Sequence, residues 1–580
     1  MGDSKTPAES WQAKASAKRA RRDSAIPAEW KLPVTIWDSL KLPLESNKNN
    51  LIELEIVKKS GILTRKELEI TENYKVNALL DLLATGKLSA LEVTIAFSKR
   101  AAIAQELTQC LTETMFDQAR ERARYLDSLQ AQGKLAGPLH GLPVSLKDGF
   151  QVAGVPATLG LLSYVDFVSD TNSPLVDILL DLGAILYVKT NIPQTLLTTD
   201  SSNNIYGRVL NPWNTALSAG GSSGGEGALV AFRGSPLGVG TDVGGSIRVP
   251  STCNGTYGFK PTTSRVPYGG QQTCNNPGLK FVVAAAGPIA NDFDALELFV
   301  KTVLDKRPAA LDSSALDLPW RTVGSQEGKK IRFGFLSEDP NFPIHPPVRR
   351  TLENAAKALK SEGHEVIVLS PDEGLVTDSV AIAGLILGLD TTPAQLVQAG
   401  GEPFIPSLVA IQQASAKMRM SPEYSKFAHL SQLEGLEKLA ALNKERSRIL
   451  AEWNKLWAKH QIDAVIAPST RTTAVEHDAM GIPAYTLLLN LLDYPGCVLP
   501  YGKVEPIDVA DERGPAELNI PCKKPNDPMT WGSETNMWFS QTMRSFCKGH
   551  RVQFNCLQAS FATKSVFPLQ RWLTIVSSTL

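Results

Sequence analysis

The chain is poor in cysteine and histidine, and neither residue is arranged for a metal or a disulfide framework. The seven cysteines of its 580 residues are an odd number without paired spacing, and the histidines form no ligand pair at helical spacing. A Gly-Lys-Ser/Thr sequence is missing, and Gly238–Gly240 does not begin a dinucleotide fingerprint because the third glycine falls one place late. We therefore expect no metal and no cofactor.

An excess of one charge and a long apolar N-terminal segment are also missing. Lys and Arg number 59, as do Asp and Glu, which argues against a nucleic-acid partner. Residues 1–30 are polar and basic, so we expect no signal peptide, no stable membrane insertion and a cytoplasmic location. Residues 1–6 formally match an N-myristoylation pattern, but Asp3 and Pro7 are unfavourable, and a solvated helix face explains the basic cluster better. The sequence leaves this modification undecided.

Two serines in glycine-rich turns are the most informative feature that is present. Ser222 lies within residues 220–225 (GGSSGG), and Ser246 follows 24 residues later within residues 241–248 (TDVGGSIR). A serine hydroxyl needs a base to become a good nucleophile, and glycine lets backbone N–H groups bend around a developing oxyanion. Both requirements can be met here.

A candidate base precedes these turns. Residues 137–148 read as a turn followed by a strand, in which Leu142, Val144 and Leu146 alternate toward one face and Lys147 stands at the end. A lysine in this position can be desolvated, which lowers its pKa and makes the neutral amine available as a proton acceptor.

From about Gly137 to Thr263 the chain resembles the amidase signature family, serine hydrolases of amide bonds with a Ser-cisSer-Lys triad. The resemblance implies that Ser246 is the nucleophile and that Ser222, in a cis peptide with Gly221, bridges to the general base Lys147. It also implies an oxyanion hole of backbone N–H groups, and a Leu196 side chain beside the acyl group. The oxyanion-hole residues would be Val243, Gly244, Gly245 and Ser246.

Four neighbouring residues have structural interpretations. Ser223 and Glu226 have capping-box spacing, so they are interpreted first as the start of a helix, although Ser223 could also support the site. Asp242 and Arg248 flank the nucleophile, and an ion pair that holds the loop is favoured over direct chemistry.

The coarse pattern predicts an α/β fold. A helix over 175–182 and a strand over 184–188 are followed by strands over 331–336 and 366–369 that flank an amphipathic helix. A long helical stretch over 431–460 repeats leucine without keeping a heptad. With 43% hydrophobic residues and no internal repeat, we expect one large domain, in which the family fold would be a mixed central sheet sandwiched between helices.

The division of the chain is expected to be an N-terminal helical arm (1–70), an amidase catalytic domain (71–530) and an atypical C-terminal tail (531–580). The resemblance implies a closing strand and a final helix, and because the tail contains no segment that matches them, we expect both to be absent. A frameshifted or mis-spliced product and a genuinely divergent tail both remain open.

The leading functional hypothesis is an amidase that converts small or aliphatic carboxamides to a carboxylate and ammonia or an amine. A small-molecule amide is then the partner, and a homodimer is allowed. One alternative is an amidotransferase-type subunit of the same family, and another is a product whose catalysis is compromised by its C-terminus.

Overall fold

The computed structural model describes residues 10–279, 282–321, 330–502, 504–505, 508 and 573–578. Within this part, eleven strands form one sheet. In spatial order they are β1 (Leu111–Thr114), β3 (Ile185–Thr190), β2 (Pro143–Lys147), β8 (Leu237–Asp242), β10 (Ala285–Ala290), β9 (Tyr257–Lys260), β14 (Gly496–Pro500), β15 (Leu573–Ser578), β13 (Ala464–Pro468), β11 (Arg332–Leu336) and β12 (Glu365–Leu369). Two hairpin-like pairs are separate from it: β4 (Ser202–Asn203) with β5 (Gly207–Arg208), and β6 (Leu210–Asn211) with β7 (Asn214–Ser218).

The sheet is mixed, and its parallel part gathers the candidate residues. Strands β3, β2 and β8 are mutually parallel, whereas β10 and β9 run antiparallel to their neighbours. From β14 to β12 the strands are parallel again. The last residues of β2, β3 and β8 are Lys147, Thr190 and Asp242. Because parallel strands end at the same edge of a sheet, these three residues are brought together there.

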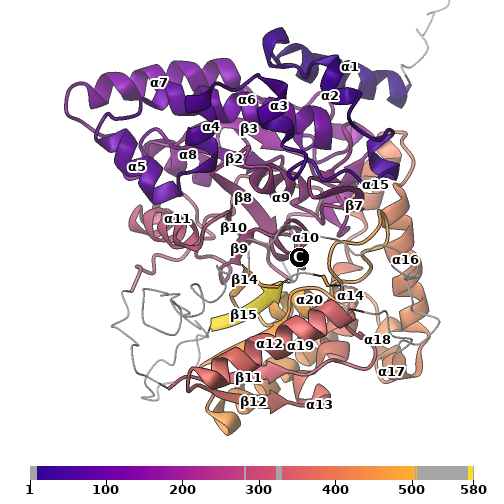
Figure 1. The fold of residues 1–580 in the computed structure, drawn as a ribbon. Helices are drawn as coiled ribbons and strands as arrows, with labels where there is room; N and C mark the ends of the chain where they lie inside the picture. Colours follow the sequence, from indigo (N-terminus) through magenta and orange to yellow (C-terminus); the bar gives the residue numbers. More distant parts are fainter. Residues whose placement is uncertain are drawn as a thin grey trace, which may run out of the picture.

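Helices surround the sheet (Figure 1). The N-terminal half of the chain lies at one end of the molecule and β11, β12, α12, α13 and α19 lie at the other, whereas α15 and α16 extend along one side toward the N-terminal half. The helices are α1 (Trp11–Ser24), α2 (Val34–Trp37), α3 (Ile56–Ser60), α4 (Arg65–Glu72), α5 (Val76–Ala84), α6 (Ala90–Thr108), α7 (Phe116–Gln130), α8 (Pro174–Asp181), α9 (Gly224–Ala231), α10 (Arg248–Asn254), α11 (Phe293–Asp305), α12 (Pro346–Ser361), α13 (Pro371–Gly374), α14 (Val376–Leu387), α15 (Thr392–Ala399), α16 (Pro406–Arg419), α17 (Pro422–Ser425), α18 (Ala428–Ser431), α19 (Gly435–His460) and α20 (Ala484–Leu491).

Local signals gave most of the predicted elements correctly. Helix α8 is followed by Gly183, whose φ of 91° is readily adopted only by glycine, and the chain turns there into β3. Helix α12 buries the apolar stripe that contains Val348, Leu352 and Leu359. It connects β11 to β12, which pair in parallel as a strand–helix–strand unit requires.

Helix α19 confirms the predicted long helix but not its row of leucines as the buried face. Leu442 is buried, whereas Leu436 is 80% exposed. The other buried residues of the helix lie nearer its C-terminal end and include two tryptophans: Ile449, Trp453, Leu456 and Trp457. The interpretation of this segment as a surface-packed helix rather than a coiled coil agrees with this arrangement.

One hydrophobic core runs through the molecule. A single cluster of buried side chains extends from Ile26 in the N-terminal part to Leu499 in β14. The prediction of a single large α/β domain with a mixed central sheet between helices is therefore confirmed. The boundaries at residues 70 and 530 stay predictions.

The expectation that the C-terminal tail supplies no closing strand is wrong. Strand β15 (Leu573–Ser578) lies between β13 and β14 and pairs in parallel with both. We expected no strand because the tail contains no segment that resembles the end of the family. The hydrogen bonds between strands, however, use backbone groups that any non-proline residue provides, so a dissimilar segment can also form a strand. The expected absence of a final helix concerns residues outside the described ranges.

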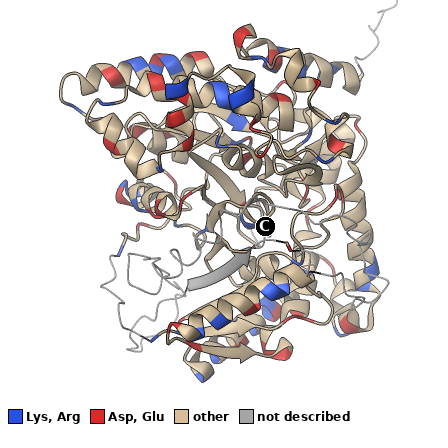
Figure 2. Ribbon diagram, in the orientation of Figure 1, with Lys and Arg blue, Asp and Glu red and all other residues tan. Residues whose placement is uncertain are grey.

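The surface carries both charges. Figure 2 shows lysine and arginine interspersed with aspartate and glutamate on the outer helices. Among the described helices, no single one is long and apolar enough to cross a membrane. The pair Pro371–Leu387 and Thr392–Ala399, bent by 51°, meets that length and composition only when taken together. Most of α14, which forms the larger part of this pair, is buried in the fold.

Candidate active site

The turn after β8 presents Ser246 at the edge of the sheet. Residues 243–247 connect β8 to α10, and Gly245 adopts a φ of 132°. A Cβ atom on Gly245 would lie 2.4 Å from Thr486 Oγ1, so both the backbone conformation and the space require glycine here. Ser246 is 8% exposed, and its Oγ makes no hydrogen bond within the described part of the chain. Its hydroxyl is therefore available for chemistry.

The carboxylate of Asp242 organises this turn from inside. It accepts hydrogen bonds from the backbone N–H groups of Gly245 (2.8 Å) and Ile247 (3.1 Å), and from Arg248 Nε (3.0 Å) and Nη2 (2.9 Å). Both charged side chains are wholly buried. Burial alone would raise the pKa of Asp242, but the charge and hydrogen bonds of Arg248 lower it well below its usual value. The predicted ion pair is present, and its carboxylate accepts hydrogen bonds from two backbone N–H groups of the loop.

This arrangement corrects one member of the predicted oxyanion hole. The N–H of Gly245 points to Asp242 and is not free to bind a developing oxyanion. The N–H groups of Gly244 and Ser246 donate no hydrogen bond to any described residue. Together with the adjacent Val243, they are the remaining candidates from the predicted set.

Helix α20 completes the support of the loop, which the sequence did not predict. Asn490 Nδ2 donates to Asp242 Oδ1 (3.0 Å), and Arg248 donates to Asn490 Oδ1. Thr486 Oγ1 donates to the carbonyl oxygen of Gly244 (2.7 Å). More than 200 residues separate α20 from this turn in sequence, so no local pattern could have indicated the contact.

The second glycine-rich turn carries Ser222 into contact with Lys147. The peptide bond between Gly221 and Ser222 is cis, and α9 begins two residues later. A Cβ atom on Gly221 would lie 2.7 Å from the carbonyl oxygen of Thr198, so a larger residue does not fit. Ser222 is 2% exposed, and its Oγ lies 2.7 Å from Lys147 Nζ. The contact that the resemblance implied is present.

Lys147 ends β2 in a wholly enclosed position. Its Nζ also donates to Thr241 Oγ1 (2.8 Å), and the side chain has no carboxylate at ion-pair distance among the described residues. Burial lowers the pKa of Lys147 to about 7, although the negative charge of Asp242 and that of Glu226 when ionised raise it in part. A substantial share of the amine is therefore neutral at neutral pH and can accept a proton.

The two serine turns touch through their backbones rather than their hydroxyls. The N–H of Ser223 donates to the carbonyl oxygen of Ser246 (3.1 Å), which fixes the turns side by side. No hydrogen bond joins Ser246 Oγ to Ser222 Oγ within the described residues. The structure thus joins Lys147 to Ser222 directly and places Ser246 in the adjoining turn.

The helix start that the spacing of Ser223 and Glu226 predicted is confirmed, but their side chains do not form the capping box. Ser223 does stand at the N-cap of α9, but its side chain forms no cap hydrogen bond. Its Oγ donates instead to the carbonyl oxygen of Thr241 (3.3 Å), which links the two turns. Glu226 points into the sheet, where the hydroxyl groups of Ser145 and Thr190 hold it. Tertiary contacts override the local motif because every residue of α9 is buried.

Leu196 contributes to an apolar cluster at the end of a short 3-10 helix, η4 (Gln194–Leu196). It packs, together with Leu396 and the aromatic residues Tyr164 and Phe404, against five buried residues that are aliphatic apart from one thiol: Leu159, Leu161, Ile192, Cys274 and Val397. The Cys274 thiol donates to the carbonyl oxygen of Thr195 (3.2 Å), and burial raises its pKa to about 12. Leu197 is 37% exposed and lies outside this cluster.

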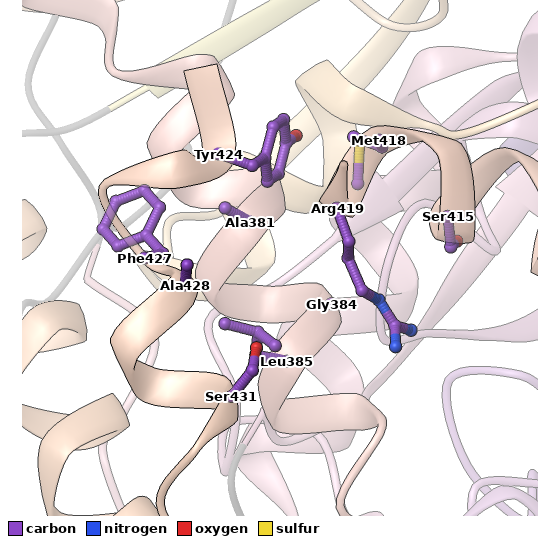
Figure 3. A pocket seen from close by; sticks show the side chains of 10 residues that line it. All are labelled: Ala381, Gly384, Leu385, Ser415, Met418, Arg419, Tyr424, Phe427, Ala428 and Ser431. Carbon is purple, nitrogen blue, oxygen red and sulfur yellow. The ribbon is translucent and has the colours of Figure 1, made fainter. Parts of the chain in front are cut away.

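A separate small hollow lies between α14 and the segment α16–α18 (Figure 3). Its volume is about 60 Å³, well below that of a typical ligand pocket. Tyr424, Phe427 and Met418 provide apolar walls, and none of its lining residues belongs to the site described above.

The chain matches the family model described as Amidase over residues 92–511. It is 38% identical over 497 residues to an amidase from Gibberella moniliformis, covering 85% of this chain and 90% of the relative. An acetamidase from Emericella nidulans is 38% identical over 509 residues, covering 85% and 87%. A solved structure of a fatty acid amide hydrolase superposes with a TM-score of 0.75 at 31% identity, covering 84% of this chain and 82% of the other.

The mixed sheet of this α/β fold thus places a buried amine–hydroxyl pair next to the turn that carries Ser246. The chain belongs to the amidase signature family. It is accordingly an amide hydrolase, an enzyme that acts on carbon–nitrogen bonds.

Proposed function

We propose that the enzyme hydrolyses aliphatic carboxamides through an acyl-enzyme on Ser246, with Ser222 as the proton bridge and Lys147 as the general base. The observation that carries this proposal is the 2.7 Å contact between Lys147 Nζ and Ser222 Oγ in a wholly buried setting. Burial lowers the pKa of Lys147 to about 7, so the base is in its working state near neutral pH.

In the acylation step, Ser246 Oγ attacks the carbonyl carbon of the amide while its proton passes to Ser222 Oγ. Ser222 gives its own proton to the neutral Lys147 amine, so the ammonium form of Lys147 balances the oxyanion of the tetrahedral intermediate. A rotation of the Ser246 side chain supplies the hydrogen bond to Ser222 that the resting structure lacks. The oxyanion is stabilised by N–H groups of the turn, with Gly244 and Ser246 as free donors.

Collapse of this intermediate reverses the proton path. The carbon–nitrogen bond breaks as Lys147 returns a proton through Ser222 to the leaving nitrogen, and ammonia or an amine departs. A water molecule then attacks the ester on Ser246 while the same relay takes its proton. The carboxylate is released and the serine is restored.

The acyl group is proposed to be aliphatic and uncharged. Leu196 and its cluster provide aliphatic side chains near the end of β3, and the cluster contains no charged group. Two relatives at 37–38% identity have the name acetamidase, which supports a short acyl group in the substrate of this enzyme. Because the fold is also similar to that of a fatty acid amide hydrolase, amides with long acyl chains are the substrates to compare with the short ones.

The test is ammonia release from a series of primary aliphatic amides of increasing chain length, with a positively charged amide and an aryl amide for contrast. We expect kcat/KM to be highest for uncharged aliphatic amides. Ser246→Ala should lose turnover and labelling by a fluorophosphonate while it keeps the thermal unfolding transition of the parent enzyme. Full labelling of that variant would rule out Ser246 as the nucleophile.

A further inference from the structure

Glu226 is a buried ionisable group that the reaction above does not use. It lies in the first turn of α9, is wholly buried, and has no lysine or arginine at ion-pair distance among the described residues. Its Oε2 lies 2.6 Å from Ser145 Oγ, and its Oε1 accepts a hydrogen bond from Thr190 Oγ1 at 2.9 Å. Burying a carboxylate without a positive partner costs free energy, so the group is charged only if its hydrogen bonds stabilise the charge. The hydrogen-bond partners of Glu226 therefore indicate its protonation state.

The position of Glu226 is next to the general base. Ser145 stands two residues before Lys147 on β2, and Thr190 is the residue of β3 that pairs with Lys147. The carboxyl group also fills the space over Gly238 of β8, where a Cβ atom would lie 2.0 Å from Glu226 Oε2. Strands β2 and β3 therefore contact the Glu226 carboxyl group through Ser145 and Thr190, and β8 leaves space for it at Gly238.

The hydrogen bonds around Ser145 determine where the protons are. Ser145 Oγ lies 2.6 Å from Glu226 Oε2 and 2.9 Å from Ser235 Oγ, and Ser235 Oγ lies 2.9 Å from the carbonyl oxygen of Leu237. These are three hydrogen bonds in a row that end on an oxygen which can only accept. The two serine hydroxyls supply two hydrogens, so all three contacts can be hydrogen bonds at the same time only if the carboxyl group supplies the third.

The neighbouring groups do not supply that hydrogen. Tyr187 donates its phenol hydrogen to the carbonyl oxygen of Gly234, and Thr190 donates to the other oxygen of Glu226. With Glu226 protonated, it donates to Ser145, Ser145 donates to Ser235, and Ser235 donates to Leu237. Every hydrogen then has an acceptor, which is the favourable arrangement in a buried polar network.

We propose that Glu226 works as a neutral carboxylic acid and is a positioning residue for Lys147. As an acid it fixes the Ser145–Lys147 segment of β2 and places no negative charge beside the base. As a carboxylate it would favour the ammonium form of Lys147 and withdraw the base from the reaction. The catalytic part of this inference rests on the proposed function, whereas the location of the proton does not.

The electrostatics of the surroundings agree with this assignment. Burial raises the pKa of Glu226 to about 8, and the hydrogen bonds from Ser145 and Thr190 and the Lys147 charge lower it only in part. The other ionisable groups that face the carboxyl group are the Tyr187 phenol of β3 and the Cys110 thiol before β1, and burial raises the pKa of both. Those that face Lys147 are Asp242 of β8 and Cys274 in the loop after β9.

The decisive variant is Glu226→Gln. Glutamine offers one acceptor oxygen and one NH₂ group with two hydrogens in nearly the same shape, so it can reproduce both the donor and the acceptor of the acid, whereas the carboxylate has no donor. We expect kcat/KM at neutral pH to stay within about threefold of the parent enzyme, with the acidic limb of the pH profile unmoved. A limb that moves to lower pH in Glu226→Gln would show that Glu226 is an anion in the parent enzyme and would overturn the proposal. Loss of most activity in a folded Glu226→Gln enzyme would overturn it as well.

Thermal unfolding gives a readout that needs no catalysis. An acid whose pKa is raised on folding loses stabilisation as pH rises from its ordinary value near 4.5 to about 8. The parent enzyme should therefore lose Tm relative to Glu226→Gln, by a margin that widens from about pH 5 to about pH 8. A constant margin over this range would mean that Glu226 is already ionised in the folded enzyme, and the proposal would fail whatever the mechanism is.

Asp312→Asn is the matched control for stability. Asp312 is also buried, but it accepts from the backbone N–H groups of Tyr268, Gly269 and Ser314 and so serves as a carboxylate. These hydrogen bonds lower its pKa, although burial opposes them, and the group is ionised in both the folded and unfolded chain above about pH 5. The difference in Tm between the parent enzyme and Asp312→Asn should be independent of pH from about 5 to 8. The proposed function fails by a different result. If Lys147→Ala stayed active with an unchanged acidic limb, the role of Lys147 as the base would be refuted, but the conclusion that Glu226 is protonated would still stand.

Discussion

Lys147 Nζ and Ser222 Oγ lie 2.7 Å apart although 75 residues separate them in the sequence. One stands at the end of a central strand, and the other in a turn whose glycines admit no side chain. The amine is neutral enough to act as a base only because this contact is closed off from water. The proposed mechanism therefore depends on a contact between two segments that are distant in the sequence.

The pH dependence of catalysis should follow the protonation of Lys147. Because its pKa is lowered to about 7, kcat/KM should fall below neutral pH as the ammonium form accumulates, by up to tenfold for each further pH unit. Lys147→Ala should lose most activity, and its residual rate should lack this acidic limb. Pre-incubation of each sample at the assay pH, followed by a return to neutral pH, separates titration from unfolding. The same limb in the variant would refute the role of Lys147.

Removal of the bridging hydroxyl should slow acylation more than it affects folding. In Ser222→Ala the path from Ser246 to Lys147 is broken, and we expect a loss of about 10²–10⁴ in the acylation rate. A water molecule in the vacated space can restore part of it. Ser223→Ala is the control, because the hydrogen bonds of Ser223 Oγ within the described residues are with the backbone of Thr241 and not with Lys147 or Ser246. We therefore expect its acylation rate to stay close to that of the parent enzyme. A burst of product with parental rate in Ser222→Ala would reduce Ser222 to a structural residue.

The ion pair beneath the nucleophile should matter for stability. Asp242→Ala leaves the wholly buried Arg248 without its counter-charge, and about 3–5 kcal/mol of the free energy of unfolding should be lost. Two backbone N–H groups of the turn also lose their acceptor. The measurement is denaturation by urea, with Glu55→Ala as control, since the Glu55–Lys58 pair is exposed and should change little. An unchanged midpoint for Asp242→Ala would contradict the structural role of the pair.

The C-terminal strand should be necessary for a complete sheet. Strand β15 pairs with β13 and β14, which are themselves almost fully buried. A chain that ends after residue 572 should therefore leave two rows of backbone groups unpaired and show a lower Tm and a lower soluble yield than the full chain. Comparison of the two chains by thermal unfolding tests this directly. Equal stability would show that β15 does not contribute to the folded sheet.

Local patterns were sufficient for most elements and for the type of chemistry. The alternation before Lys147, the glycine after α8 and the apolar stripe of α12 each fix one element because a period or a positive φ leaves few alternatives. The capping spacing of Ser223 and Glu226 failed because a helix that is buried on all sides obeys its tertiary partners rather than its end motif. The tail was misjudged because a backbone ladder accepts almost any sequence.

The sequence by itself determined which residues are available: two serines in glycine-rich turns, one lysine at the end of a strand, and two residues of opposite charge on either side of Ser246. Only the tertiary structure decided what each of them does. It withdrew the Gly245 N–H from the oxyanion hole, added Thr241 beside Lys147, and brought Asn490 to the ion pair. It also enclosed Lys147 and Glu226 so completely that their pKa values moved toward each other. The physical reason is that desolvation and hydrogen-bond geometry depend on everything that surrounds a group in space, and the order of residues along the chain does not specify those surroundings locally.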